Sequence, residues 1–148
     1  MGFYTSIEVS ATGLSAERLA MDTIANNIAN VNTTRTPEGG PFKRQLVVYA
    51  QKNAPAPATG TSTDANDPAS SSAGVDVVGV VNDQGPDRLI YDPSHPDADA
   101  NGYVHMPNID VVKEMVDMMA ASRAYEANVT AIQEARAMGT ATLGLLKA

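Results

Sequence analysis

The chain has 148 residues, of which 43% are hydrophobic and only 5% are aromatic, with no tryptophan. This length suits one modest domain or one elongated subunit, and the composition excludes a thick aromatic core. Because cysteine is absent, thiol catalysis, disulfide bonds, cysteine-ligated zinc and iron–sulfur clusters are excluded. We expect a fold that depends on noncovalent packing alone.

The formal net charge of −7 is concentrated in one segment. Eight of the 17 acidic residues, but only one of the 10 basic residues, lie between Asp64 and Asp99. The rest of the chain is therefore neutral, so its two ends can pack against copies of themselves without strong repulsion. The acidic balance argues against nucleic acid or anionic lipid as a partner, because both require a basic surface.

No membrane or Sec-type targeting segment is expected. The first basic residue is Arg18, and no apolar block follows a charged start. No stretch approaches the ~20 apolar residues that a membrane span needs. We therefore predict no direct membrane insertion.

The first zone, residues 1–32, is predicted to be an amphipathic helix with a narrow apolar stripe. Its start is expected at Thr5, paired with Glu8 in a capping box. Its end is expected at Asn30 or Asn32 in the left-handed conformation. The apolar residues recur in two heptad positions: Ile7, Leu14, Met21 and Ile28 in one, with Phe3, Ile24 and Val31 in the other.

The last zone, residues 108–148, repeats this pattern over a greater length. Asn108 is the expected N-cap, and Asp110 lies in the first turn, where a carboxylate favours the helix dipole. A helix from Ile109 to Leu146 would be about 55 Å long at 1.5 Å per residue, too long for a compact domain of this size. The seam residues are Val111, Met118, Tyr125, Ile132, Gly139 and Leu146 in one position, with Met115, Val129 and Leu143 in the other.

The middle zone, residues 33–107, is predicted to be rich in turns. Residues 43–51 and 75–81 are expected to form strands, and residues 88–91 are expected to pair with 75–81 in a hairpin across the turn at 83–86. Residues 53–74 contain no aliphatic side chain larger than alanine, so we expect a flexible loop there.

These zones together predict a mainly α fold. The N- and C-terminal helices are expected to pair as an antiparallel coiled coil, with a small middle insert that contains a β-hairpin. The longer helix extends beyond the shorter one and leaves apolar residues uncovered. We therefore expect a helical assembly of many chains.

Five ordered sequence blocks then indicate a family. They are Ala25–Thr33 (ANNIANVNT), Thr34–Phe42 (TRTPEGGPF), Gly102–Asp110 (GYVHMPNID), Glu114–Met118 (EMVDM) and Ser122–Asn128 (SRAYEAN). In these blocks the chain resembles the bacterial flagellar axial proteins, the rod and hook family, and among them the proximal rod subunits. The resemblance covers both ends and most of the middle, but not residues 53–74.

The resemblance implies a structural subunit rather than an enzyme, with no cofactor. It implies export through the flagellar type III apparatus and helical assembly into the basal-body rod, the drive shaft that crosses the periplasm. The implied partners are other copies, neighbouring rod proteins, and the membrane-embedded MS ring with its adaptor at the base. Another short rod subunit remains an alternative.

The candidate functional residues are therefore assembly residues on the two helices. For the asparagines near residue 30, two interpretations stay open: helix termination, or hydrogen bonds between subunits that fix axial register. The candidates are Leu14, Met21, Asn26, Asn27, Ile28, Asn30, Met115, Met118, Arg123, Tyr125, Glu126, Asn128, Ile132 and Leu146.

Two features of the last zone also have alternative interpretations. Met115, Met118 and Met119 suit either ordinary core packing or an adaptable binding face. Arg123 and Glu126 suit either an intrahelical pair or a bridge between chains.

One cluster suggests an alternative chemistry. His95, Asp97, Asp99 and His105 carry the imidazoles and carboxylates that a transition metal binds, as a soluble metal-dependent hydrolase would require. Their spacing matches no helical zinc motif, and a surface loop is the favoured interpretation.

Overall fold

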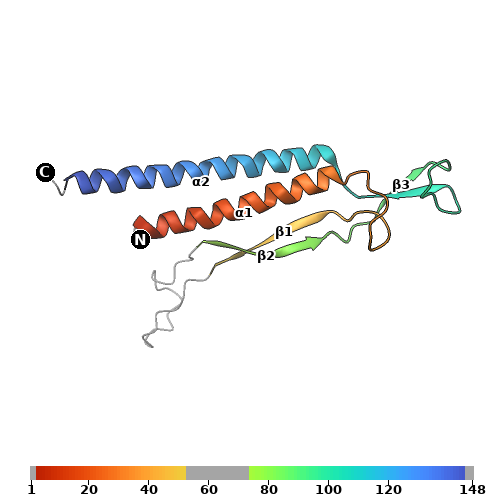
Figure 1. Cartoon of the computed structure of the whole chain (residues 1–148), viewed down its shortest axis with the longest axis horizontal. Helices are drawn as coiled ribbons and strands as arrows, with labels where there is room; N and C mark the ends of the chain where they lie inside the picture. Colours follow the sequence, from red (N-terminus) through yellow and green to blue (C-terminus); the bar gives the residue numbers. More distant parts are fainter. Residues whose placement is uncertain (1–2, 53–73, 146–148) are drawn as a thin grey trace, which may run out of the picture. The chain divides into compact units, whose positions relative to one another are not determined.

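A computed structural model describes residues 3–52 and 74–145, with side chains described from residue 6 to residue 144 within those ranges. In sequence order, two long helices flank a middle region of short strands, as the colours of Figure 1 show. The predicted pair of terminal helices around a strand-containing insert is confirmed. In chain order the elements are α1 (Phe3–Ala29), β1 (Gln45–Gln51), β2 (Val75–Asn82), β3 (Arg88–Tyr91), β4 (Tyr103–Met106) and α2 (Val111–Leu145).

The chain divides into two compact units, and each contains a piece of both helices. The first unit consists of the described residues of Met1–Arg18, Tyr49–Val78 and Arg123–Ala148. The second consists of Leu19–Val48 and Gly79–Ser122. Segments that are far apart in the sequence, from α1, the strands and α2, therefore meet within each unit.

Helix α1 begins earlier than predicted. It starts at Phe3, so Thr5 lies inside the helix and does not cap it. The capping box at Thr5 and Glu8 is therefore wrong as the helix start.

The predicted left-handed asparagine at the end of α1 is also wrong, because every described residue with a positive φ is a glycine. Instead the backbone N–H of Asn30 donates to the Asn26 carbonyl at 3.1 Å, and the N–H of Thr33 donates to the Asn30 carbonyl at 3.0 Å. Successive turns satisfy the last carbonyls, so no left-handed residue is needed.

Helix α2 is capped by Asp110 rather than by Asn108. The helix begins at Val111, and Asp110 Oδ1 accepts the backbone N–H of Val112 at 3.0 Å. The Asp110 carbonyl accepts the N–H of Glu114 at 2.9 Å, the first bond of the helical ladder. Asn108 stands three residues before the helix, too early to reach these free donors.

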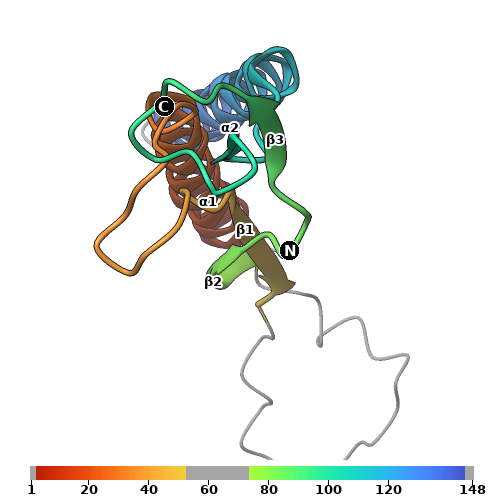
Figure 2. The same ribbon diagram turned by 90° about the vertical axis from the view of Figure 1, so that its right-hand side faces the viewer.

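The described strands form two separate two-stranded sheets. One pairs β1 with β2 (Figure 2), and the other pairs β3 with β4. Backbone bonds at opposite ends of the first pair make it antiparallel: Lys52 N–H donates to Gly74 O at 2.9 Å, and Asp83 N–H donates to Arg44 O at 2.7 Å. The predicted strands at 43–51 and 75–81 are confirmed. Of the predicted flexible segment, only Gly74 falls within the described residues.

The predicted hairpin between 75–81 and 88–91 is wrong. Strand β3 pairs antiparallel with β4, which the sequence analysis did not identify as a strand. The connecting loop has its own closure, because Asp99 Oδ1 accepts the N–H groups of Asn101 at 2.8 Å and Tyr103 at 2.9 Å. Gly102 supplies the positive φ of 80° that the loop requires before β4.

The face that α1 buries is built from small residues. Among the described side chains of α1, the buried ones are Ala16, Ala20, Thr23 and Asn27, spaced four, three and four residues apart. This spacing is one face of a helix. The predicted seam residues Leu14, Met21 and Ile28 are only half-buried. Small side chains allow close approach: a Cβ on Gly13 would lie 2.9 Å from Asn128 Nδ2 of α2.

Neither described helix contains a stretch that is both long and apolar enough to cross a membrane.

The helix cap provides a direct test of the α2 start. Replacing Asp110 with Ala removes the acceptor for the Val112 N–H, so we expect the free energy of unfolding to fall by about 1 kcal/mol. The matched control is Asn108→Ala, which should change it by less than about 0.5 kcal/mol because Asn108 is exposed. Urea unfolding followed by circular dichroism measures both, and a larger loss in Asn108→Ala would contradict the assignment.

Candidate functional site

A buried carboxylate lies at the start of α2 within the second compact unit. Glu114 and Asn27 are each 1% exposed, although both side chains are polar. Glu114 Oε2 accepts a hydrogen bond from Asn27 Nδ2 at 3.0 Å, and Glu114 Oε1 accepts one from Arg44 Nε at 2.5 Å. We call Asn27, Arg44, Gln45, Glu114 and Asp117 the Glu114 cluster. It joins the last turn of α1, the start of β1 and the first turns of α2.

Asn27 joins α1 to the start of β1 through its side-chain amide. Its Oδ1 accepts the backbone N–H of Gln45 at 2.8 Å, and its Nδ2 donates to the Gln45 carbonyl at 2.9 Å. The amide thus bonds to Gln45 as the peptide group of a neighbouring strand would. With the bond to Glu114, both donor hydrogens and the acceptor of Asn27 are used within the chain.

Asn26 adds a second contact to the same residue. Its Nδ2 donates to Gln45 Oε1 at 2.9 Å, while its Oδ1 accepts from Asn30 Nδ2 at 2.9 Å. Asn26 is exposed and Asn30 is half-buried, so these bonds lie at the edge of the cluster.

Charge balance in the Glu114 cluster depends on Arg44. The Arg44 side chain is only 14% exposed, and its Nη2 lies 3.6 Å from Asp117 Oδ2. An unpaired buried carboxylate would cost several kcal/mol, so the Arg44 contact offsets the desolvation of Glu114. Among the described residues, no buried side-chain nitrogen or oxygen lacks a hydrogen-bond partner. The buried polar atoms of the cluster are therefore all bonded, and these bonds position the end of α1, the start of β1 and the start of α2.

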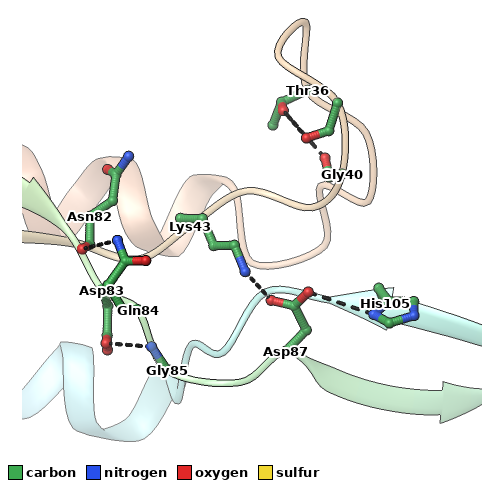
Figure 3. A network of polar contacts seen from close by, with 10 residues as sticks. Thr36, Gly40, Lys43, Asn82, Asp83, Gln84, Gly85, Asp87 and His105 are labelled. Atoms are coloured by element: carbon green, nitrogen blue, oxygen red, sulfur yellow. Dashed lines mark hydrogen bonds and ion pairs between the residues drawn. The ribbon is translucent and has the colours of Figure 1, made fainter.

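A second polar contact network lies in the same unit, before β3 (Figure 3). Lys43 Nζ pairs with Asp87 Oδ1, and His105 Nδ1 of β4 lies 3.6 Å from Asp87 Oδ2. The preceding turn is closed by Asp83 Oδ1, which accepts the Gly85 N–H at 2.9 Å. This network fixes the chain between β2 and β3.

Asp97 and His105 line one shared pocket, but the four candidate metal ligands do not form a single group. His95 Nδ1 accepts the backbone N–H of Asp97 at 3.1 Å, and Asp97 Oδ2 accepts the hydroxyl of Thr34 at 2.8 Å. Asp99 accepts backbone N–H groups, and His105 faces Asp87. Within residues 3–52 and 74–145, no three His, Asp or Glu side chains are grouped to hold a metal ion. These residues close loops, so the structure gives the hydrolase alternative no site.

Hydrogen bonds in the loop between β3 and β4 favour the ionised form of two carboxylates, Asp92 and Asp99. The backbone N–H of Tyr103 lowers the pKa of Asp99, and the hydroxyl and then the N–H of Ser94 lower the pKa of Asp92. Both carboxylates remain ionised well below neutral pH, since these donors favour the charged form.

Two of the candidate assembly residues, Arg123 and Glu126, form no ion pair in the described part of the chain, and a third, Leu146, lies outside the described residues. The candidates that are described fall into three exposure classes. Asn27 is buried; Leu14, Met21, Ile28, Asn30, Met118, Tyr125, Asn128 and Ile132 are half-buried; and Asn26, Met115, Arg123 and Glu126 are exposed.

Arg44, Gln45 and Glu114 were not predicted from the sequence as functional residues. A signal for Glu114 was present, because it falls on the same helical face as Met118 and Ala121, at spacings of four and three residues. A carboxylate on an otherwise apolar face predicts a buried partner. No comparable pattern identifies Arg44 or Gln45.

Comparison with known proteins gives the family. Residues 7–35 match the family described as flagella basal body rod protein, and residues 100–145 match the C-terminal family of the FlgEFG flagellar basal body rod proteins. The chain is 46% identical to the flagellar basal-body rod protein FlgC of Borreliella burgdorferi, with 99% of each chain covered. It is 37% identical to FlgC of Salmonella typhimurium over 98% of each chain. Identity to FlgC of Bacillus subtilis is 39%, over 93% of this chain and 94% of that protein.

The chain belongs to the FlgC family of flagellar basal-body rod proteins. The resemblance found in the sequence blocks is therefore confirmed. So are the predictions of a structural role and of a place in the flagellar basal body, because FlgC-family proteins are rod proteins and not enzymes.

Within this FlgC-family chain, the Glu114 cluster can be tested by unfolding. Glu114→Leu removes the buried carboxylate that Arg44 Nε and Asn27 Nδ2 share and leaves Arg44 only its longer contact with Asp117, so we expect a loss of about 3–5 kcal/mol in the free energy of unfolding. The matched control Asp117→Ala should cost less than about 1 kcal/mol, because that pair is longer and its carboxylate is 45% exposed.

A second substitution separates charge pairing from packing. Adding Arg44→Met to Glu114→Leu removes the cation that has lost its buried partner. The double variant should regain most of the lost stability, because Asp117 is 45% exposed and stays hydrated without Arg44. Additive losses in urea unfolding would show that Arg44 and Glu114 do not act as a pair.

Proposed function

We propose that this chain is a subunit of the proximal rod, in which copies and other rod proteins assemble helically and transmit torque. The names of the FlgC relatives support a place for this chain in the rod, and one observation supports assembly through the helices. That observation is an apolar stripe on α2 that remains exposed in the single chain. Rod assembly would cover it, because a large exposed apolar surface marks an interaction site.

The α2 stripe consists of Val112, Met115, Val116 and Met119. Their exposed fractions are 71%, 54%, 54% and 53%, respectively. The spacings of three, one and three residues place all four on one helical face. Burying the exposed part of each such side chain would contribute about 1–2 kcal/mol, which favours association with neighbouring helices.

We propose further that α1 and α2 pair as an antiparallel coiled coil. Two places where α1 lies close to α2 support this pairing, one in each compact unit. They are Asn27 with Glu114, and Gly13 with Asn128. On α1, Gly13 lies 14 residues before Asn27. On α2, Asn128 lies 14 residues after Glu114. Equal and opposite steps of about 21 Å are what antiparallel helices require.

The candidate assembly residues then have two roles in the proposal. Met115 and the half-buried Met118, Tyr125 and Ile132 would contact neighbouring subunits directly. Asn27 would act indirectly, because its amide is fully bonded within the chain and it holds α1 against β1. Densely packed helices with interlocked side chains transmit strain, as torque transfer requires.

The remaining partners follow from family membership alone. We propose contacts with the rod-to-MS-ring adaptor and the MS ring at the base, after export through the flagellar type III apparatus. These are the partners that a proximal rod subunit in the flagellar axial family would meet.

The α2 stripe gives the test of assembly. Met115→Asp places a charge on a side chain that is already exposed, so we expect the purified chain to keep its free energy of unfolding within about 0.5 kcal/mol. In the rod the same carboxylate would be desolvated without a partner. Swimming in soft agar should fall to the nonflagellated level, and isolated basal bodies should lack a complete rod.

The matched control is Gln133→Asp, which adds the same charge at an exposed polar position of α2. It should leave swimming near the unmodified level. Normal swimming of the Met115→Asp strain would remove the stripe from the proposed interface.

A further inference from the structure

The outer face of the β3–β4 hairpin is a second exposed surface, separate from the α2 stripe. The register pairs Leu89 with His105 and Tyr91 with Tyr103, so these four side chains share one face of the hairpin. The opposite face carries the pair Ile90 and Val104, of which Val104 is 1% exposed and Ile90 38%. On that face the hairpin therefore buries the β4 side of the pair, whereas Leu89, Tyr91, Tyr103 and His105 are all exposed.

The outer face is apolar and aromatic in character. Leu89 is 56% exposed, Tyr91 65% and Tyr103 41%, while the His105 side chain is 50% exposed. We call Leu89, Tyr91, Tyr103 and His105 the hairpin surface. It occupies two adjacent strands and is not a set of scattered single residues, which makes it a candidate interaction site.

The two tyrosines are already ordered. Their ring centroids are 5.3 Å apart at an interplanar angle of 66°, an edge-to-face pair. A Cβ on Gly102 would lie only 3.0 Å from Tyr91 Cε2, so the glycine lets the Tyr91 ring lie against the backbone. Rings held in place before binding lose little conformational entropy when a partner arrives.

The surroundings of the hairpin surface are acidic. Residues 83–106 contain five aspartates and one arginine. Asp92 follows Tyr91 directly, and Asp99 accepts the backbone N–H of Tyr103 at 2.9 Å. In the described part of the chain, neither carboxylate forms an ion pair with lysine or arginine.

We propose that the hairpin surface binds a segment of another protein that carries arginine or lysine among apolar residues. Apolar side chains of the segment would cover Leu89 and the tyrosine rings. Its cations would lie over the ring faces and near Asp92 and Asp99. A second copy of this chain is the poorer match, since its own hairpin is equally acidic and its net charge is −7.

Photo-cross-linking in intact cells tests this proposal. The photoreactive residue p-benzoylphenylalanine replaces Tyr91 in the full chain in its host bacterium, and cross-linked peptides are identified by mass spectrometry after irradiation. We expect one dominant adduct with a different protein, at a segment that contains arginine or lysine beside apolar residues. The control position is Glu38, an exposed residue on the loop before β1, which should not give that adduct.

Swimming of the same cells separates this inference from the proposed rod function. Cells that swim but give no adduct at Tyr91, or only an adduct with a second copy, would overturn the hairpin proposal and leave rod assembly intact. An adduct with a segment that lacks cations would overturn it as well. If the Tyr91 replacement stops swimming, Leu89 on the same face serves as the second position, with the same expected partner and the same contrary outcomes.

A charge measurement provides an independent readout. The double variant Leu89→Lys and Tyr103→Lys adds two cations to the exposed face without touching the buried Val104. We expect at least a tenfold loss of the Tyr91 adduct, whereas Leu89→Ala with Tyr103→Phe should lose less than threefold. Equal losses in the two double variants would contradict a cationic partner.

Discussion

The arrangement of this chain depends on one buried carboxylate. Glu114 requires strong donors once it is removed from water, and the chain supplies them from Asn27 at the end of α1 and Arg44 just before β1. Each donor is separated from Glu114 by 70 or more positions in sequence. Satisfying this group therefore fixes where both helices and the first strand meet. The amide of Asn27 strengthens the junction because it bonds to both backbone groups of Gln45.

This constraint explains why large apolar residues remain exposed. The buried positions of α1 near the junction are small or polar, and they allow close approach but cover little area. Met115, Met119 and their neighbours on α2 then remain more than half exposed to solvent. A subunit that forms its own polar junction and leaves apolar helix faces open suits an assembly, since specificity and association come from different residues. The β3–β4 hairpin likewise leaves apolar side chains exposed, at Leu89, Tyr91 and Tyr103.

Local patterns in the sequence predicted part of this structure, and long-range contacts determined the rest. Heptad spacing located both helices, and apolar runs located β1 and β2. The partner of β3 could not be predicted, because it depends on the loop that Asp99 and Gly102 close before β4. Apolar spacing also favoured Leu14, Met21 and Ile28 as the packed face, whereas the chain buries Ala16, Ala20 and Thr23. Hydrophobicity alone does not reveal that close approach matters more than side-chain size at that contact.

Hydrogen exchange of the Gln45 backbone amide in the isolated chain is the most direct test of this junction. That N–H donates to the Asn27 side chain, so its exchange reports the junction and not the helices around it. The account predicts slow exchange in the dilute monomer, and fast exchange in Asn27→Ala. A Gln45 amide that exchanges in the unmodified monomer as quickly as an exposed loop amide would show that the Glu114 cluster does not hold these elements together.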